Sequence, residues 1–150
     1  MVVSVASDHA GFELKQKVIA HLKEMGMEVI EGGAVTSDKP YNYVDAGIKV
    51  AEDVVSGRAE RGVAICGTGI GISVTVNKYK GIRCAPCTNE YMARMSRQHN
   101  DANVIALGAR VVGQAVALGI VDAFFGEDFA GERHAERVNN IKELEERNFK

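Results

Sequence analysis

The side chain best suited to chemistry in this sequence is the thiol of Cys66, which ends the apolar run 62–66. Glycines follow it at every second position, in Gly67-Thr68-Gly69-Ile70-Gly71, before a helical pattern begins. A glycine-rich turn at a helix N-terminus presents unpaired backbone N–H groups and a partial positive charge, so it binds anions and favours a thiolate. The alternative is a buried, inert cysteine, which is the commoner environment of this residue type.

The turn after Cys66 is not a dinucleotide fingerprint. It lacks the third glycine of that motif, since Ile72 stands there, and it follows the third apolar run rather than the first. We therefore predict an anion-binding turn, with the hydroxyl of Thr68 beside the thiol.

Two histidines are placed where they could contact a ligand. Asp8 and His9 follow the first apolar run, and His9 opens a helical pattern where a core histidine is not expected. Asp8 is equally suited to capping that helix. His99 lies in a polar run before a buried segment, and it is the side chain there that can transfer protons near neutral pH. A solvated loop is the alternative for this run, above all for Arg97 and Asp101.

Arginines near the end of the chain are suited to phosphate. Arg133 and Arg137 are four residues apart and therefore share one face of a helix. Guanidinium groups bind phosphate in a bidentate manner, and Arg110 could join the pair. Surface ion pairing with Glu132 and Glu136 is the alternative. A thiol, an anion-binding turn, a histidine and three arginines together favour proton transfer on a small phosphorylated carbonyl compound.

The remaining cysteines allow a second hypothesis. Cys84 and Cys87 form a C-x-x-C that leads into a helical pattern, which is the spacing of a dithiol redox site. One such pair does not make a structural zinc site, so no metal site is predicted. The chain has three cysteines, an odd number, which does not make a disulfide framework and indicates a reducing, cytoplasmic environment.

The elements that position these residues follow from hydrophobic spacing. Short apolar runs predict strands at 2–6, 27–31, 62–66, 82–85 and 104–107. Apolar residues at helical spacing predict helices at 14–25, 46–55, 70–77, 89–97, 112–125 and 132–150. The alternation predicts a Rossmann-like three-layer α/β/α fold with a five-stranded, mostly parallel sheet. In such sheets the ligand binds beyond the carboxyl ends of the strands.

Two segments of this plan have more than one interpretation. The irregular segment 34–43 is long enough to be a functional loop. The strongly apolar helix predicted at 112–125 is suited either to the core or to a subunit interface.

The overall composition indicates one globular domain over residues 1–150, since that length is typical of one domain and no proline-rich linker divides it. A net charge of −2 gives no basis for binding nucleic acid or an anionic membrane. No apolar stretch approaches the roughly 20 residues that span a bilayer.

Several motifs, taken in order, resemble those of the type B ribose-5-phosphate isomerases, a family that includes galactose-6-phosphate isomerase subunits and allose-6-phosphate isomerases. The motifs are Ser7-Asp8-His9-Ala10-Gly11-Phe12-Glu13-Leu14-Lys15, Cys66-Gly67-Thr68-Gly69-Ile70-Gly71, Asn77-Lys78, Gly81-Ile82-Arg83, Ser96-Arg97-Gln98-His99-Asn100-Asp101-Ala102-Asn103-Val104, Gly108-Ala109-Arg110 and Arg133-His134-x-x-Arg137. The resemblance covers nearly the whole chain. It implies an aldose–ketose phosphate isomerase that needs no metal or organic cofactor.

The resemblance also implies a role for each matched residue. Cys66 is the base that moves a proton between C1 and C2, His99 is the acid that helps open the furanose ring, and the turn 67–71 holds the enediolate with backbone N–H groups. Substrate contacts are implied for the phosphate at His9, Arg110, Arg133 and Arg137, and for the sugar at Asp8, Tyr43 and Asn100. The family forms homodimers, sometimes tetramers, with each site built from both subunits. One branch uses a glutamate base at the position of Ile72, so this chain resembles the cysteine branch.

One departure bears on the substrate. The family often reads Asp-Tyr-Pro where this chain has Asn42-Tyr43-Val44, within the loop that borders the sugar. Ribose 5-phosphate is the expected substrate, and allose 6-phosphate or galactose 6-phosphate is the alternative. A noncatalytic sugar-phosphate sensor and a thiol redox protein are the competing classes.

Overall fold

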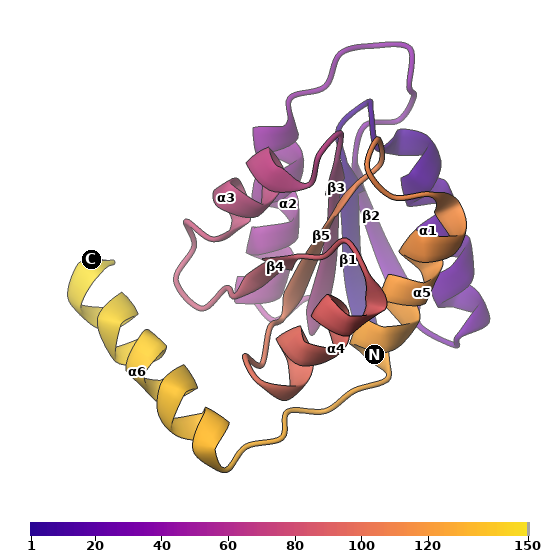
Figure 1. Ribbon diagram of the computed structural model, residues 1–150. Helices are drawn as coiled ribbons and strands as arrows, with labels where there is room; N and C mark the ends of the chain where they lie inside the picture. Colours follow the sequence, from indigo (N-terminus) through magenta and orange to yellow (C-terminus); the bar gives the residue numbers. More distant parts are fainter. Residues whose placement is uncertain (150) are drawn as a thin grey trace.

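Five parallel strands form the centre of the molecule, in the order β2-β1-β3-β5-β4 (Figure 1). They are β1 (Val2–Ser7), β2 (Glu28–Gly33), β3 (Arg61–Cys66), β4 (Cys84–Pro86) and β5 (Val104–Gly108). The computed structural model describes residues 1–149. Every strand pairing within these residues is parallel, which confirms the predicted sheet.

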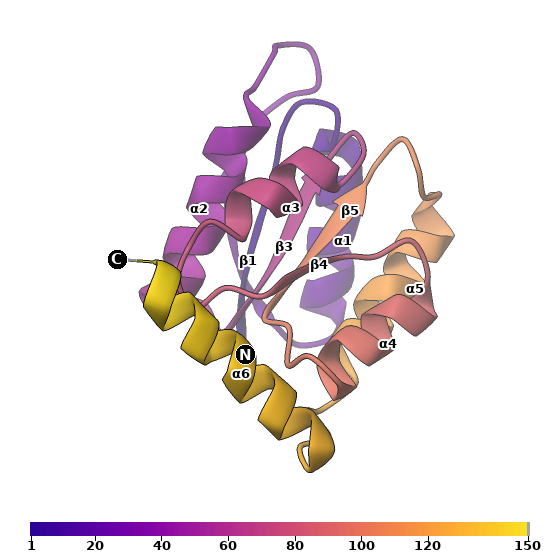
Figure 2. The same ribbon diagram turned by 60° about the vertical axis from the view of Figure 1, so that its left-hand side comes forward.

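Helices cover both faces of this sheet. They are α1 (Phe12–Glu24), α2 (Tyr43–Val55), α3 (Ile70–Val76), α4 (Glu90–Gln98), α5 (Gln114–Phe125) and α6 (Arg133–Asn148). Helices α1 and α5 lie on one face, α2 and α3 lie on the other, and α4 packs beside α5 (Figures 1 and 2). The three-layer, single-domain α/β architecture is therefore confirmed.

The two faces of the sheet carry side chains of different size, because successive residues of a strand point to opposite sides. Val5, Ile65 and Leu107 are fully buried toward α1 and α5. Alanines such as Ala6 and Ala64 face α2 and α3. Because both faces are covered, the strands are continuous apolar runs in the sequence.

The apolar helix predicted at 112–125 is a core helix in this chain. It begins at Gln114, and its residues Ala117, Ile120, Val121 and Phe124 are completely buried. Burying side chains of the size of Ile120 or Phe124 contributes about 1.5–3 kcal/mol each to folding.

Several elements differ from their predicted bounds. Helix α2 begins at Tyr43 because the side chain of Asn42 caps it, accepting a hydrogen bond of 2.9 Å from the Val44 N–H. Strand β4 begins at Cys84 and has three residues, since Ile82 precedes the segment that pairs with β5. Helix α6 ends at Asn148; Lys150, which the prediction included in this helix, lies outside the described residues.

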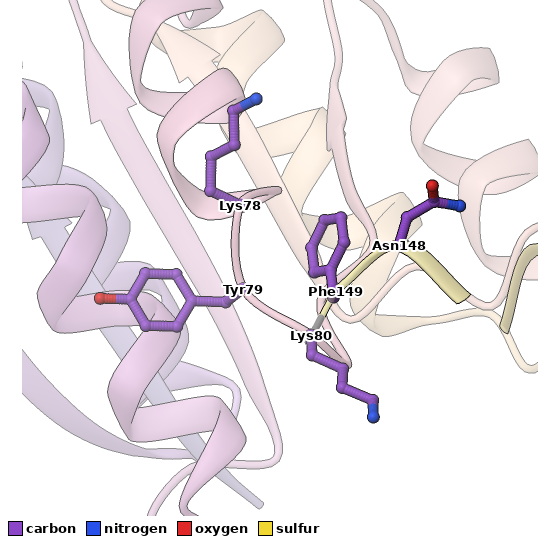
Figure 3. A pocket seen from close by; sticks show the side chains of 5 residues that line it. All are labelled: Lys78, Tyr79, Lys80, Asn148 and Phe149. Carbon is purple, nitrogen blue, oxygen red and sulfur yellow. The ribbon is translucent and has the colours of Figure 1, made fainter. Parts of the chain in front are cut away.

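Helix α6 stands apart from the layers and is attached near its ends (Figure 2). Glu145 Oε1 accepts a hydrogen bond of 2.8 Å from the Gly81 N–H, and Lys80 lies 2.7 Å from Glu146. A hollow of about 460 Å³ lies between the segment 78–80 and the end of α6 (Figure 3). It is lined by Lys78, Tyr79, Lys80, Asn148 and Phe149, and none of these is a predicted site residue. Within residues 1–149, the helices are too short or too polar to cross a membrane.

Candidate active site

The carboxyl ends of β1 and β3 form the place in the sheet where a ligand is expected. The chain leaves β1 toward β2 on one side, and it leaves β3 toward β5 and β4 on the other. Such a change of direction opens a crevice between the two strands. The Asp8 N–H donates to the Ile65 carbonyl at 3.2 Å, so the residues that follow the two strands lie side by side.

Cys66 ends β3 in this crevice and is 4% exposed. Its Sγ accepts a hydrogen bond of 3.2 Å from the Gly69 N–H, at the first turn of α3. Gly69 has φ of +79°, and a Cβ there would lie 3.0 Å from the Leu107 carbonyl carbon. A side chain at this position is therefore excluded twice, by the left-handed backbone and by the close approach of β5.

The turn beside Cys66 keeps backbone donors free. The Ile70 N–H donates to Thr68 Oγ1 at 3.2 Å, which fixes the turn. The N–H groups of Gly67, Thr68 and Gly71 make no hydrogen bond to any described residue. Free donors next to a buried sulfur are the arrangement that stabilises an oxyanion as charge develops on it.

Two side chains rest on the glycines of this turn. A Cβ on Gly71 would lie 2.6 Å from the ring of Tyr43, and one on Gly67 would lie 3.2 Å from Arg110 Nη1. Tyr43 and Arg110 are exposed. The fold therefore brings both predicted residues to the Cys66 turn, and the missing side chains of the two glycines make room for them.

Asp8 and His9 occupy the adjacent end of β1. Asp8 is 7% exposed and its Oδ1 accepts a hydrogen bond of 3.0 Å from the Gly11 N–H, so its carboxylate orders the first turn before α1. The Tyr41 N–H donates to His9 Nδ1 at 3.0 Å. The same nitrogen lies 3.3 Å from the Tyr41 carbonyl oxygen, to which only a protonated Nδ1 could donate. The shorter contact is the one with the backbone N–H, which can only donate, so the geometry favours an unprotonated Nδ1 with the ring proton on Nε2.

The other predicted residues lie at the opposite edge of the sheet. His99 caps α4, and Asn100 follows it, before β5 begins at Val104. Cys66 is in register with Gly108, at the far end of β5. Val104 and Gly108, the two ends of β5, are four residues apart. At about 3.3 Å per residue, the two ends of the strand are separated by roughly 13 Å. Within one chain, His99 and Asn100 therefore do not lie beside Cys66.

His99 belongs to a second cluster with α6. Its ring stacks on that of His134, with centroids 4.0 Å apart and planes 12° apart. Arg133 and Arg137 are exposed on the same helix, and neither forms an ion pair within the described residues. Burial, and then the charges of His99, Arg133 and Arg137, lower the pKa of His134. Nothing in the sequence pointed to His134 beyond its place beside Arg133.

The loop that carries His99 and Asn100 is held in place by hydrogen bonds from arginine side chains, one of which, Arg97, is buried. Arg97 is 6% exposed, and its Nη1 donates to Asp101 Oδ1 at 2.9 Å and to the Ala102 carbonyl at 2.7 Å. Arg83 Nη2 donates to the Asp101 carbonyl at 2.8 Å. The solvated-loop interpretation of Arg97 is wrong, and the two arginines hold Asp101 in its left-handed conformation, at φ of 47°.

The surroundings of Cys84 and Cys87 do not favour a reactive dithiol. Both are free thiols. Burial raises the pKa of Cys87 to about 12, and burial together with neighbouring Cys87 raises the pKa of Cys84. Because the thiolate is the nucleophile in disulfide exchange, these environments disfavour redox chemistry. Among residues 1–149, no three histidine, cysteine or acidic side chains are grouped as metal ligands would be.

Known proteins resemble the whole chain. A family model described as ribose/galactose isomerase matches residues 3–141. The chain belongs to this family. It is 46% identical to the ribose-5-phosphate isomerase B of Escherichia coli, over 97% of each chain. A galactose-6-phosphate isomerase subunit of Clostridium acetobutylicum is 40% identical, over 96% of this chain and 99% of its own.

A solved structure agrees with these sequence matches. The ribose-5-phosphate isomerase B of Clostridium thermocellum is 52% identical and superimposes with a TM-score of 0.95, over 98% of this chain and 99% of its own. The resemblance inferred from the motifs is thereby confirmed, and the chain is an isomerase of the type B ribose-5-phosphate isomerase family.

Proposed function

We propose that this protein interconverts ribose 5-phosphate and ribulose 5-phosphate through a cis-enediolate, with Cys66 as the base. The observation that carries the proposal is the buried Cys66 sulfur beside the unpaired N–H groups of Gly67, Thr68 and Gly71. An α-hydroxy carbonyl needs both a base and a stabilised oxyanion, and this turn offers both within one segment.

The chemistry moves one proton at a time. The Cys66 thiolate takes the proton from C2 of the open-chain aldose, the C–H electrons form the C1–C2 double bond, and the C1 carbonyl oxygen becomes the enediolate oxygen. The resulting thiol returns the proton to C1, while the proton of the C2 hydroxyl moves to the oxygen on C1, so that C2 becomes the ketone, C1 carries the hydroxyl and the thiolate is restored. Each fixed N–H donor that holds the developing charge contributes about 3–4 kcal/mol to the transition state.

Ring opening requires an acid, and His99 is the proposed one. Because His99 lies at the opposite edge of the same chain, the His99 of a second copy would serve each site. Asn100, Arg133 and Arg137 lie in the same cluster as His99, so the second copy would supply them as well. The unpaired guanidinium groups of Arg133 and Arg137 would then join His9 and Arg110 in binding the phosphate. The proposed active form is therefore a homodimer or a larger symmetric assembly, with each site shared.

A five-carbon substrate is the first choice, because the relatives with the higher identities are ribose-5-phosphate isomerases B. The six-carbon alternative rests on the galactose-6-phosphate isomerase subunit that is 40% identical. In this chain the Asn42 side chain caps α2 through the Val44 N–H, a bond that a proline at position 44 could not make. The loop that borders the sugar is thus anchored in a way that the family's usual sequence does not allow.

The test is a substrate panel with a matched pair of variants. We expect kcat/KM for ribose 5-phosphate to exceed that for allose 6-phosphate and galactose 6-phosphate. Cys66→Ala should abolish turnover while calorimetry still detects binding, and Cys84→Ala should leave turnover intact. Full activity of Cys66→Ala would remove Cys66 as the base. Calorimetric binding by the wild-type protein without isomerisation of any panel member would instead support a sugar-phosphate sensor.

A further inference from the structure

Lys15 is a fully buried lysine that the proposed mechanism does not use. It lies on α1, its side chain is 1% exposed, and it packs 5.2 Å from the centre of the Phe12 ring. Its ammonium donates to the Gly32 carbonyl at 2.9 Å and to the Ala34 carbonyl at 2.5 Å. The Glu31 carboxylate, 3.1 Å away, completes its surroundings. An ammonium has three donors, and here each of them has an acceptor.

Two of the acceptors, Glu31 and Gly32, belong to the end of β2, and the third, Ala34, is the first residue of the segment 34–42. This segment has no regular structure, and most of it is exposed. At its start, the Ala34 N–H donates to the Ser7 carbonyl at 2.8 Å, and the Ala34 carbonyl binds Lys15. Lys15 therefore fixes the first residues of the segment to the β1–α1 part of the chain.

The other end of the same segment enters the candidate active site. The Tyr41 N–H binds His9, and Asn42 caps the helix whose first residue, Tyr43, rests on Gly71. Segment 34–42 is thus attached at both ends to the part of the chain that follows β1: Lys15 binds Ala34 at its start, and His9 binds Tyr41 near its end. Releasing one end lengthens the free loop and loosens the position of Tyr41 and Tyr43.

We propose that Lys15 is a positioning residue for substrate binding, which sets the conformation of segment 34–42 and through it the placement of His9 and Tyr43. This rests on the proposed function, which assigns His9 to the phosphate, and on the family resemblance, which implies that Tyr43 contacts the sugar. Lys15 touches no predicted substrate contact directly. The ammonium is buried, and a buried ammonium that loses its acceptors is costly, so its bonds to the two carbonyls and to the partly exposed Glu31 carboxylate form a stiff attachment. The same attachment also orders Glu31, since Lys15 and Gln16 both bind its carboxylate.

The test compares Lys15→Met with Asp53→Asn as a matched control. Asp53 is also a fully buried charge with three partners, Ser4, Lys49 and Arg58, but it lies near the end of α2 remote from the Cys66 turn. Both variants should lower the melting temperature. Lys15→Met should also raise KM for ribose 5-phosphate at least about fivefold with kcat within about twofold, whereas Asp53→Asn should leave both constants unchanged.

Hydrogen exchange gives a second measurement that does not depend on turnover. In Lys15→Met, amides of segment 34–42 should exchange at least roughly tenfold faster, while those of β3 stay as in the wild type. Glu31→Gln, which weakens the same attachment without emptying the buried site, should change both measurements in the same direction and decides the question if Lys15→Met does not fold. Wild-type exchange in segment 34–42 together with a wild-type KM would overturn the proposal. Faster exchange in a protein without isomerase activity would support the attachment and refute only the proposed function.

Discussion

The sharing of each site between two copies can be tested by mixing inactive chains. One chain carries Cys66→Ala and the other carries His99→Asn, each with a different affinity tag, so that the mixed dimer can be purified. If Cys66 of one copy works with His99 of the other, the mixed dimer contains one site with both groups intact and one site with neither. Each parent homodimer contains no intact site.

The activity expected of the mixed dimer follows from the geometry of the sheet. Cys66 and His99 of one chain are separated by at least the length of β5, roughly 13 Å, whereas proton transfer needs contact within about 3 Å. A site within one chain is therefore not expected, and one intact site in two gives about half of the wild-type kcat per dimer in the mixed species.

A second mixed dimer makes the assay decisive. It pairs the wild-type chain with a chain that carries both Cys66→Ala and His99→Asn. Shared sites leave this dimer with no intact site and no activity above the parents, whereas sites within one chain would leave it half active. A coupled spectrophotometric assay for ribulose 5-phosphate should thus find about half of the wild-type activity in the first mixed dimer and no activity above the parents in the second. Half activity of the second dimer would refute the shared site.

Three further outcomes are expected. Nitrogen NMR of His9 should show the neutral ring protonated at Nε2, because the Tyr41 N–H lies nearer to Nδ1, at 3.0 Å, than the Tyr41 carbonyl oxygen does, at 3.3 Å; a proton on Nδ1 in the neutral ring would contradict this. Burial acts to raise the pKa of Asp53, but hydrogen bonds and charges from its partners lower it below the ordinary value, so its stabilising effect is present above about pH 4 and is lost as pH falls through the folded-state pKa. Asp53→Asn should therefore destabilise the protein by about 1–3 kcal/mol in urea titrations at pH 7, and by less below pH 4. The double variant Cys84→Ser/Cys87→Ser should keep the wild-type kcat/KM. A change in kcat/KM would indicate that a disulfide between the two cysteines regulates activity.

The fold could be predicted from the sequence because its strands are buried on both faces. Runs such as 62–66 and 104–107 contain no polar interruption, and the helices between them repeat apolar residues at helical spacing. The observed bounds differ from the predicted ones where hydrogen bonds of side chains, and not the hydrophobic pattern, determine where a helix or strand begins. Asn42 extends α2 by capping it, and the carbonyl and N–H of Cys84 are both bound by the Asn77 side chain at the start of β4.

The half of the site around Cys66 could be predicted, and the half around His99 could not be placed. Residues after β1 and β3 meet because parallel strands align their carboxyl ends, so Asp8, His9 and the Cys66 turn follow from topology alone. His99 follows a helix, and a helix in this fold returns the chain to the opposite edge of the sheet. The same topology that groups the first set therefore separates His99 from it within one chain, and the proposed homodimer is what would bring the two together.

Lys15 shows a signal that the hydrophobic pattern contains but that a search for apolar residues misses. The residues of α1 that are buried are Lys15, Val18, Ile19 and Leu22, spaced as i, i+3, i+4 and i+7. A pattern built on apolar residues alone, Leu14, Val18, Leu22 and Met25, leaves Lys15 out, and Met25 is 38% exposed. A lysine in phase with the apolar face of a helix cannot be left unpaired in the core, so it implies acceptors in a neighbouring element. Here those acceptors are the end of β2 and the start of segment 34–42, which is why a residue without a chemical role in the motif bears on the shape of the active site.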